Sequence, residues 1–94
     1  MSYELIVLAE FESASGLTRA EIVELVEHGV FAPVGQAVDE WAFPESTLAV
    51  ARVAARLRAD FELPAASLAL LLAYRERMLE LEQRVRELEC RLPR

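Results

Sequence analysis

Residues 16–43 constrain the fold of this chain more strongly than any other segment. Thr18 is a natural N-cap and Glu21 follows it by three residues, which is the capping-box pattern that begins a helix. Apolar residues then recur at helical spacing, and Gly29 stands where a left-handed residue commonly ends a helix. Gly16 supplies a turn just before the cap. A helix of this kind behind a tight turn is typical of the second helix of a helix-turn-helix.

Short apolar segments on both sides of a polar loop predict a wing after this helix. Residues 30–32 (Val-Phe-Ala) and 41–43 (Trp-Ala-Phe) have the composition of strands around a loop that contains glycine. Residues 3–7 (YELIV) predict a further short strand, which we expect to pair with residues 41–43. Residues 8–15 predict the short first helix of the helix-turn-helix, although no side chain near Val7 is suited to cap it.

Two more helices are predicted in the second half of the chain. Pro44 suits the first turn of a helix that runs to about residue 61, with a buried stripe made of Val50, Val53, Ala54, Leu57 and Phe61. Pro64 then begins a longer helix that reaches about Leu92. The predicted fold is therefore mainly α: a winged helix-turn-helix domain with a small β wing over residues 1–62, and a long C-terminal helix over residues 63–94.

The long helix carries a heptad repeat. Apolar residues fill seven successive a and d positions, namely Leu71, Tyr74, Met78, Leu81, Val85, Leu88 and Leu92. We expect Leu68, Leu71 and Leu72 to pack on the protein's own core. Beyond Met78 little core remains to be covered, so the stripe predicts a dimer interface there, and all seven of its residues are candidate dimerisation residues.

Charges beside the stripe bear on the orientation of such a dimer. In a parallel pair, Arg77 would meet Glu82 of the partner and Arg84 would meet Glu89, whereas an antiparallel pair would bring arginines together. The charges favour a parallel homodimer. Cys90 falls at an outward position and is expected to be an exposed thiol.

The distribution of charge conflicts with DNA binding. Residues 1–47 contain nine acidic residues and one arginine, a formal charge of −8, while residues 48–94 carry +2, and the chain has no lysine. Contacts from Arg and Lys to phosphates supply most of the affinity of a DNA-binding domain, so the acidic half should repel a duplex. The same field would attract a basic protein surface. The candidate partner-binding residues are Glu21, Glu24, Glu27, Asp39 and Glu40. The plainer alternative is that these acids only keep a small domain in solution.

No pattern in the sequence indicates catalysis, a cofactor or a metal. The single histidine, His28, has only Glu24 at a suitable spacing for a shared metal, and two ligands do not make a site. A glycine-rich phosphate loop is also missing. We therefore expect a protein that is not an enzyme. One cysteine excludes an internal disulfide, and neither an apolar run of about 18 residues nor a basic leader is present, so we also expect a cytoplasmic protein.

The order of several motifs resembles a known family. They are Glu10-Phe11, the turn Ser15-Gly16-Leu17-Thr18, Glu24-Leu25-Val26, Gly29-Val30 with Pro33, Trp41-Ala42-Phe43, and Arg56-Leu57-Arg58-Ala59-Asp60 before a leucine-rich helix. Over nearly the whole chain this resembles the chaperone modulatory protein CbpM family, a branch of the MerR-like winged helix-turn-helix group. The loop at residues 34–39 has no diagnostic residue. The resemblance implies a small cytoplasmic protein that binds the J-domain of the DnaJ-like co-chaperone CbpA. It implies that binding inhibits both the co-chaperone activity with the Hsp70 DnaK and the DNA binding of CbpA.

Two other functions remain open at this point. A dimeric MerR-like transcription regulator could use Arg52, Arg56 and Arg58, which we expect mostly on the outer side of the third helix. A structural dimerisation module without a regulatory partner is the third reading. The sign of the charge on the helix from Thr18 to His28 separates the chaperone modulator from the DNA-binding regulator.

Overall fold

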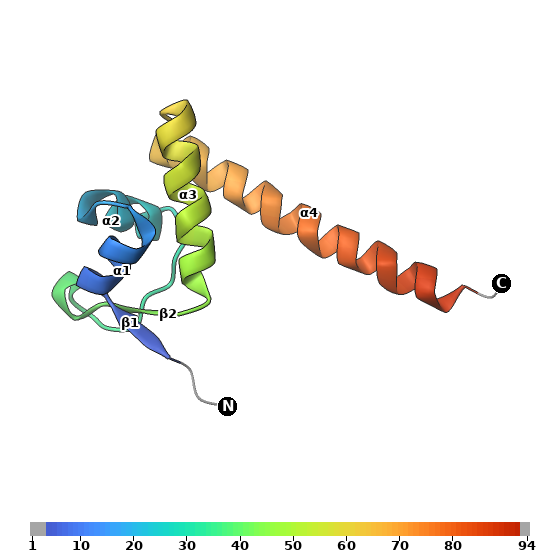
Figure 1. The fold of residues 1–94 in the computed structure, drawn as a ribbon, viewed down its shortest axis with the longest axis horizontal. Helices are drawn as coiled ribbons and strands as arrows, with labels where there is room; N and C mark the ends of the chain where they lie inside the picture. The colour runs from blue at the N-terminus through green and yellow to red at the C-terminus, as the bar shows by residue number, and fades with distance from the viewer. Residues whose placement is uncertain (1–3, 93–94) are drawn as a thin grey trace.

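The computed structural model describes residues 4–92 of the chain, and within them the predicted mainly helical fold is confirmed. The elements in order are β1 (Leu5–Val7), α1 (Leu8–Ser15), α2 (Arg19–Glu27), the short 3-10 helix η1 (Val38–Glu40), β2 (Ala42–Pro44), α3 (Thr47–Phe61) and α4 (Ala65–Arg91). Figure 1 shows α1, α2 and α3 gathered at one end of the molecule, with α4 running away from them.

The helix-turn-helix is formed by α1 and α2, and its turn has the predicted capping box. The Thr18 hydroxyl accepts a hydrogen bond from the Glu21 amide at 3.2 Å, and the Glu21 carboxylate accepts one from the Thr18 amide at 2.9 Å. Gly16 ends α1 in the left-handed conformation, with φ of 85°. Leu17 fills the turn and is buried. Two of the free amides at the start of α2 are therefore satisfied by local side chains.

The segment after α2 forms a helix cap, so the strand predicted at residues 30–32 is wrong. The Gly29 amide donates to the Val26 carbonyl at 3.0 Å, and the Val30 amide donates to the Leu25 carbonyl at 2.9 Å. This pair of bonds is a Schellman motif around Gly29, which has φ of 80°. Because the cap uses the Val30 amide and Phe31 turns into the core, no strand can begin there.

The small sheet pairs β1 with β2, as predicted, and its two strands are antiparallel. Ile6 lies opposite Phe43 and Val7 lies opposite Ala42, while the predicted first residue of the strand, Tyr3, lies outside the described residues. The wing is reduced to a single bridge in which Val34 and Ala42 exchange two hydrogen bonds of 2.8 and 2.9 Å.

The start of α3 differs from the prediction that Pro44 opens it. Pro44 ends β2, opposite Leu5, and α3 begins at Thr47. A proline is compatible with the end of an edge strand because the ladder does not need its missing amide there.

The buried face of α3 is formed by small residues. Ala51 and Ala54 are fully buried and Val50, Val53 and Leu57 are half-buried, whereas Phe61, predicted to be buried, is 65% exposed. Alanines allow α1 and α3, which are in contact, to approach closely. The buried face of α3 is therefore centred on its alanines, and Phe61, the last residue of the helix, stays exposed.

Three phenylalanines from distant segments form the centre of the core. Phe11 of α1 stacks on Phe43 of β2 with ring centroids 4.2 Å apart, and Phe31 meets both rings edge-on. Trp41 packs against Phe43 at 6.2 Å. Edge-to-face and offset stacks are the favourable arrangements of aromatic rings. The cluster joins α1 and the segment that follows α2 to the sheet.

The long helix α4 belongs to the core only in its first turns. Ala65, Leu68 and Leu72 are buried, but Leu71, which we expected to pack with them, is 44% exposed. The Cα radius of gyration is 15.7 Å, against about 12 Å for a compact chain of this length. The remaining part of α4 extends freely from the rest of the molecule (Figure 1).

Candidate partner-binding surfaces

The outer face of α2 carries two of the nominated acids. Ile22 and Leu25 are buried on its inner face, so helical spacing places Glu24 and Glu27 on the exposed side. Neither has an ion-pair partner among residues 4–92. Both carboxylates are therefore available to a binding partner.

Glu21, the third acid of α2, was predicted on the same outward face, but the structure turns its side chain toward α3. Its carboxylate pairs with the Arg58 guanidinium at 2.8 Å and also closes the capping box with Thr18. Its side chain is only 21% exposed. These contacts hold Glu21 against α3, so it serves the fold rather than an open acidic surface.

The 3-10 helix η1 presents the other two nominated acids. Asp39 and Glu40 are both exposed. Arg19 at the start of α2 contacts Asp39 at 3.4 Å and Glu12 of α1 at 3.2 Å. The arginine thus links η1 to the helix-turn-helix and neutralises part of its charge.

The arginines of the N-terminal part and of α3 are mostly engaged by the protein itself. Arg19 and Arg58 pair with acids, and Arg52 donates to the Ala14 carbonyl at 3.3 Å. Arg56 is exposed and has no ion pair among the described residues. A DNA-binding surface needs several such free cations, and this part of the chain offers few of them.

The role of Arg58 was missed in the sequence analysis. It was expected among the exposed arginines, yet besides the Glu21 pair it donates to the Leu63 carbonyl at 3.1 Å. That carbonyl lies in the turn between α3 and α4, where Glu62 has a left-handed φ of 51°. The only sequence signal was the Arg-Leu-Arg motif at the end of the third helix.

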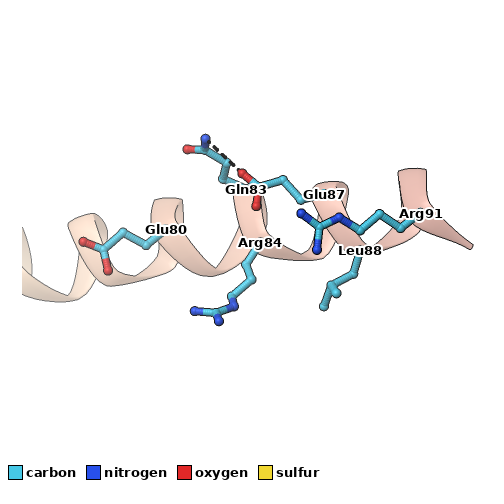
Figure 2. Close-up of a pocket in the computed structure, with 6 residues that line it drawn as sticks. All are labelled: Glu80, Gln83, Arg84, Glu87, Leu88 and Arg91. Carbon is cyan, nitrogen blue, oxygen red and sulfur yellow. Dashed lines mark hydrogen bonds between the residues drawn. The ribbon is translucent and has the colours of Figure 1, made fainter.

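The predicted dimerisation residues form an uncovered apolar stripe on α4. All seven are between 44% and 67% exposed: Leu71, Tyr74, Met78, Leu81, Val85, Leu88 and Leu92. Figure 2 shows Arg84 and Leu88 pointing to one side of the helix, while Gln83 and Glu87 are joined by a hydrogen bond of 3.5 Å. An arginine beside an apolar seam position is typical of a coiled coil.

The charges along α4 pair within the helix in this structure. Arg77 contacts Glu80 at 3.5 Å and Arg86 contacts Glu82 at 4.0 Å, with all four side chains more than half exposed. Exposed pairs of this kind contribute little to stability, about 0.3–0.5 kcal/mol each at helical spacing. They can therefore exchange for contacts to another chain at small cost.

Neither a metal centre nor a membrane anchor is evident in the described residues. Within residues 4–92, no three His, Cys, Asp or Glu side chains converge as a metal site requires. None of the helices described there combines the length and the apolar character needed to cross a bilayer. Within residues 4–92, the exposed acids and the apolar stripe are the surfaces best suited to bind other macromolecules.

The helix-turn-helix, the reduced wing and the extended C-terminal helix define a MerR-type helix-turn-helix regulatory protein. The family model described as MerR HTH family regulatory protein matches residues 6–90. The chaperone modulatory protein CbpM of Coxiella burnetii (strain Dugway 5J108-111) is 35% identical over 80 residues, covering 85% of this chain and 76% of the relative.

Two relatives from another organism match the whole chain. The chaperone modulatory protein CbpM of Pseudomonas putida (strain W619) is 33% identical over 97 aligned positions, covering all of this chain and 96% of the relative. The protein of the same name from strain GB-1 is 30% identical over the same coverage. The chain belongs to the CbpM family of chaperone modulatory proteins, within the MerR helix-turn-helix group.

Proposed function

We propose that this protein is a chaperone modulator that binds the J-domain of a DnaJ-like co-chaperone of the CbpA type. Binding inhibits the co-chaperone's action with its Hsp70 and also its DNA binding, without catalysis by the modulator. The observation that carries the proposal is membership in a family whose relatives are named chaperone modulatory proteins. A cytoplasmic site of action accords with the single exposed thiol, Cys90.

The acidic surface supports this partner. J-domains present a basic helix to Hsp70, as the family resemblance implies. Glu24 and Glu27 of α2 and Glu40 of η1 are exposed and have no ion pair among residues 4–92. Complementary charge accelerates association and selects the partner. A modulator that occupied the basic helix would exclude Hsp70 from the same surface.

DNA binding as a transcription regulator is the second candidate, because the MerR family match favours it. The engagement of Arg19, Arg52 and Arg58 within the protein argues against it. The acidic outer face of α2 would also lie toward the phosphates if that helix entered the major groove. A gel-shift titration at low salt should therefore give no complex with DNA.

A homodimer through α4 is part of the proposal. Seven exposed apolar residues on one stripe would leave a large apolar surface in water if the chain remained alone. Pairing two copies along the stripe would remove that surface from solvent. Since Arg77 and Glu82 each already pair with another residue of the same helix, the stripe rather than these charges is what we expect to drive association.

Inhibition can be tested with the Hsp70 and J-domain protein of the same organism. The ATPase rate of the Hsp70 is measured with its J-domain protein while this protein is added in increasing amounts. The stimulated rate should fall toward the basal rate, whereas the basal rate of the Hsp70 alone should not change. A stimulated rate that stays constant at saturating amounts would refute inhibition.

A further inference from the structure

A groove of about 530 Å³ separates the first half of α4 from the segments that follow α2 and β2. Apolar side chains line both of its walls: Val30, Pro44 and Val50 on one side, and Ala69, Ala73 and Leu79 on the other. His28 and Gly29 stand at its edge, directly after the acidic helix α2. The groove therefore begins where the exposed face of α2 ends.

The groove uses a different side of α4 from the predicted dimer stripe. None of the α4 residues that line it occupies an a or d position of the heptad. Leu72 and Leu79 both fall at position b, which faces away from the partner helix in a coiled coil. Leu79 is 48% exposed, and a dimer along the stripe would leave it in water. The two apolar faces of α4 thus require two different occupants.

Acidic residues surround the groove. Glu76 lines it, Glu27 precedes the lining residue His28, and Glu45 stands between the lining residues Pro44 and Ser46. All three carboxylates are on exposed residues, and Arg75 is the one arginine that lines the groove among the described residues. A helix with an apolar face and basic flanks would match both the walls and the charge of this site.

We propose that the groove receives the apolar face of a basic amphipathic helix from the partner, while the basic flanks of that helix contact Glu27 and its neighbouring acids. This inference rests on the proposed function, since it takes the helix to belong to the J-domain. It extends the partner-binding surface from the carboxylates of α2 onto apolar residues of α4. Affinity then comes from apolar burial in the groove, and charge supplies selection and association rate.

The test replaces an exposed leucine inside the groove and compares it with one outside. Leu79→Arg places a positive charge in the groove, and the control Leu70→Arg changes another exposed leucine of α4 that neither lines the groove nor belongs to the stripe. Each full-length variant is titrated against the labelled full-length J-domain protein. Leu79→Arg should weaken binding by about tenfold or more, because it replaces an apolar contact of the groove by a charge, and Leu70→Arg should leave binding nearly unchanged.

The possible outcomes distinguish a failure of the groove proposal from a failure of the proposed function. Equal binding by wild type and Leu79→Arg would overturn the groove and leave the proposed function standing. If wild type does not bind at low salt, the proposed function is wrong, and so is the proposal that a J-domain helix occupies the groove. A loss of dimer mass in Leu79→Arg would show that a second copy fills the groove, which also overturns the inference. Ala73→Arg, at another exposed lining position, should reproduce the effect and guards against a folding defect in a single variant.

Discussion

Glu21 and Arg58 join three parts of the fold through a chain of three contacts. The Glu21 carboxylate caps α2 and meets Arg58 at 2.8 Å, and Arg58 in turn donates to the Leu63 carbonyl before α4. The local half of this arrangement was predictable, because a capping box depends on residues three positions apart. The pairing with Arg58 was not, because only the tertiary fold brings these residues, 37 positions apart in the sequence, into contact.

Removing the Arg58 side chain should lower stability by a modest amount. Arg58→Ala loses a half-buried ion pair and a hydrogen bond to a backbone carbonyl, so we expect the free energy of unfolding to fall by about 1–2 kcal/mol. Urea denaturation followed by circular dichroism measures the change. Arg56→Ala, at an exposed position on the same helix, is the control and should cost less than about 0.5 kcal/mol. Equal costs for the two variants would contradict the assigned role.

Two glycines with positive φ should respond differently to substitution. A Cβ at Gly35, where φ is 116°, would lie 2.6 Å from the Glu40 carbonyl oxygen, whereas at Gly29, where φ is 80°, nothing lies within 4 Å. Gly29→Ala should therefore cost about 1 kcal/mol for the left-handed backbone alone. Gly35→Ala should cost clearly more, because the loop around η1 must also move. Thermal unfolding of both variants checks the order, and a smaller loss for Gly35→Ala would contradict it.

Elements that depend on local signals were predicted correctly, whereas those that depend on a cap hydrogen bond or on tertiary packing were not. Helices α1 and α4 begin and end near their predicted residues because apolar spacing and Pro64 act locally. The strand expected at residues 30–32 failed because the cap of α2 takes the amide of Val30, and apolar composition cannot reveal that hydrogen bond. The stripe on α3 was predicted in part: Ala54 is buried as expected, but Ala51 was missed and Phe61 is exposed.

The stripe on α4 leads to a test of the dimer. Leu81→Asp places a charge at the middle of the stripe, where pairing would bury it, so the mass measured by sedimentation should fall to that of a monomer. The control is Gln83→Asp, which changes an outward-facing residue of the same helix and should leave the dimer intact. A monomeric wild type, or a dimer that survives Leu81→Asp, would show that the stripe is not the interface.

The whole molecule combines an acidic end with a long helix that carries an exposed apolar stripe. The helix-turn-helix half has a formal charge of −8, and α4 leaves it as a helix of 27 residues with an uncovered stripe. Charge and heptads are properties of composition and spacing, so both surfaces could be predicted from the sequence. Which residues belong to each surface could not be predicted from the sequence. Glu21 and Asp39 pair with arginines from other elements, and Leu79 reaches the groove only through the packing of α4.

The most direct test of the proposed function is a titration of the J-domain protein against wild type and the charge-reversed variant Glu24→Lys/Glu27→Lys. Both acids are exposed and unpaired among the described residues, so the variant should fold normally. Glu10→Lys, a reversal at an exposed acid of α1, serves as the control. We predict submicromolar binding by wild type that weakens as salt rises from about 50 to about 300 mM, since salt screens exposed charges. The variant should bind at least about tenfold more weakly, because it places like charges together. Equal affinity of wild type and variant, or wild-type binding that does not change with salt, would contradict the account.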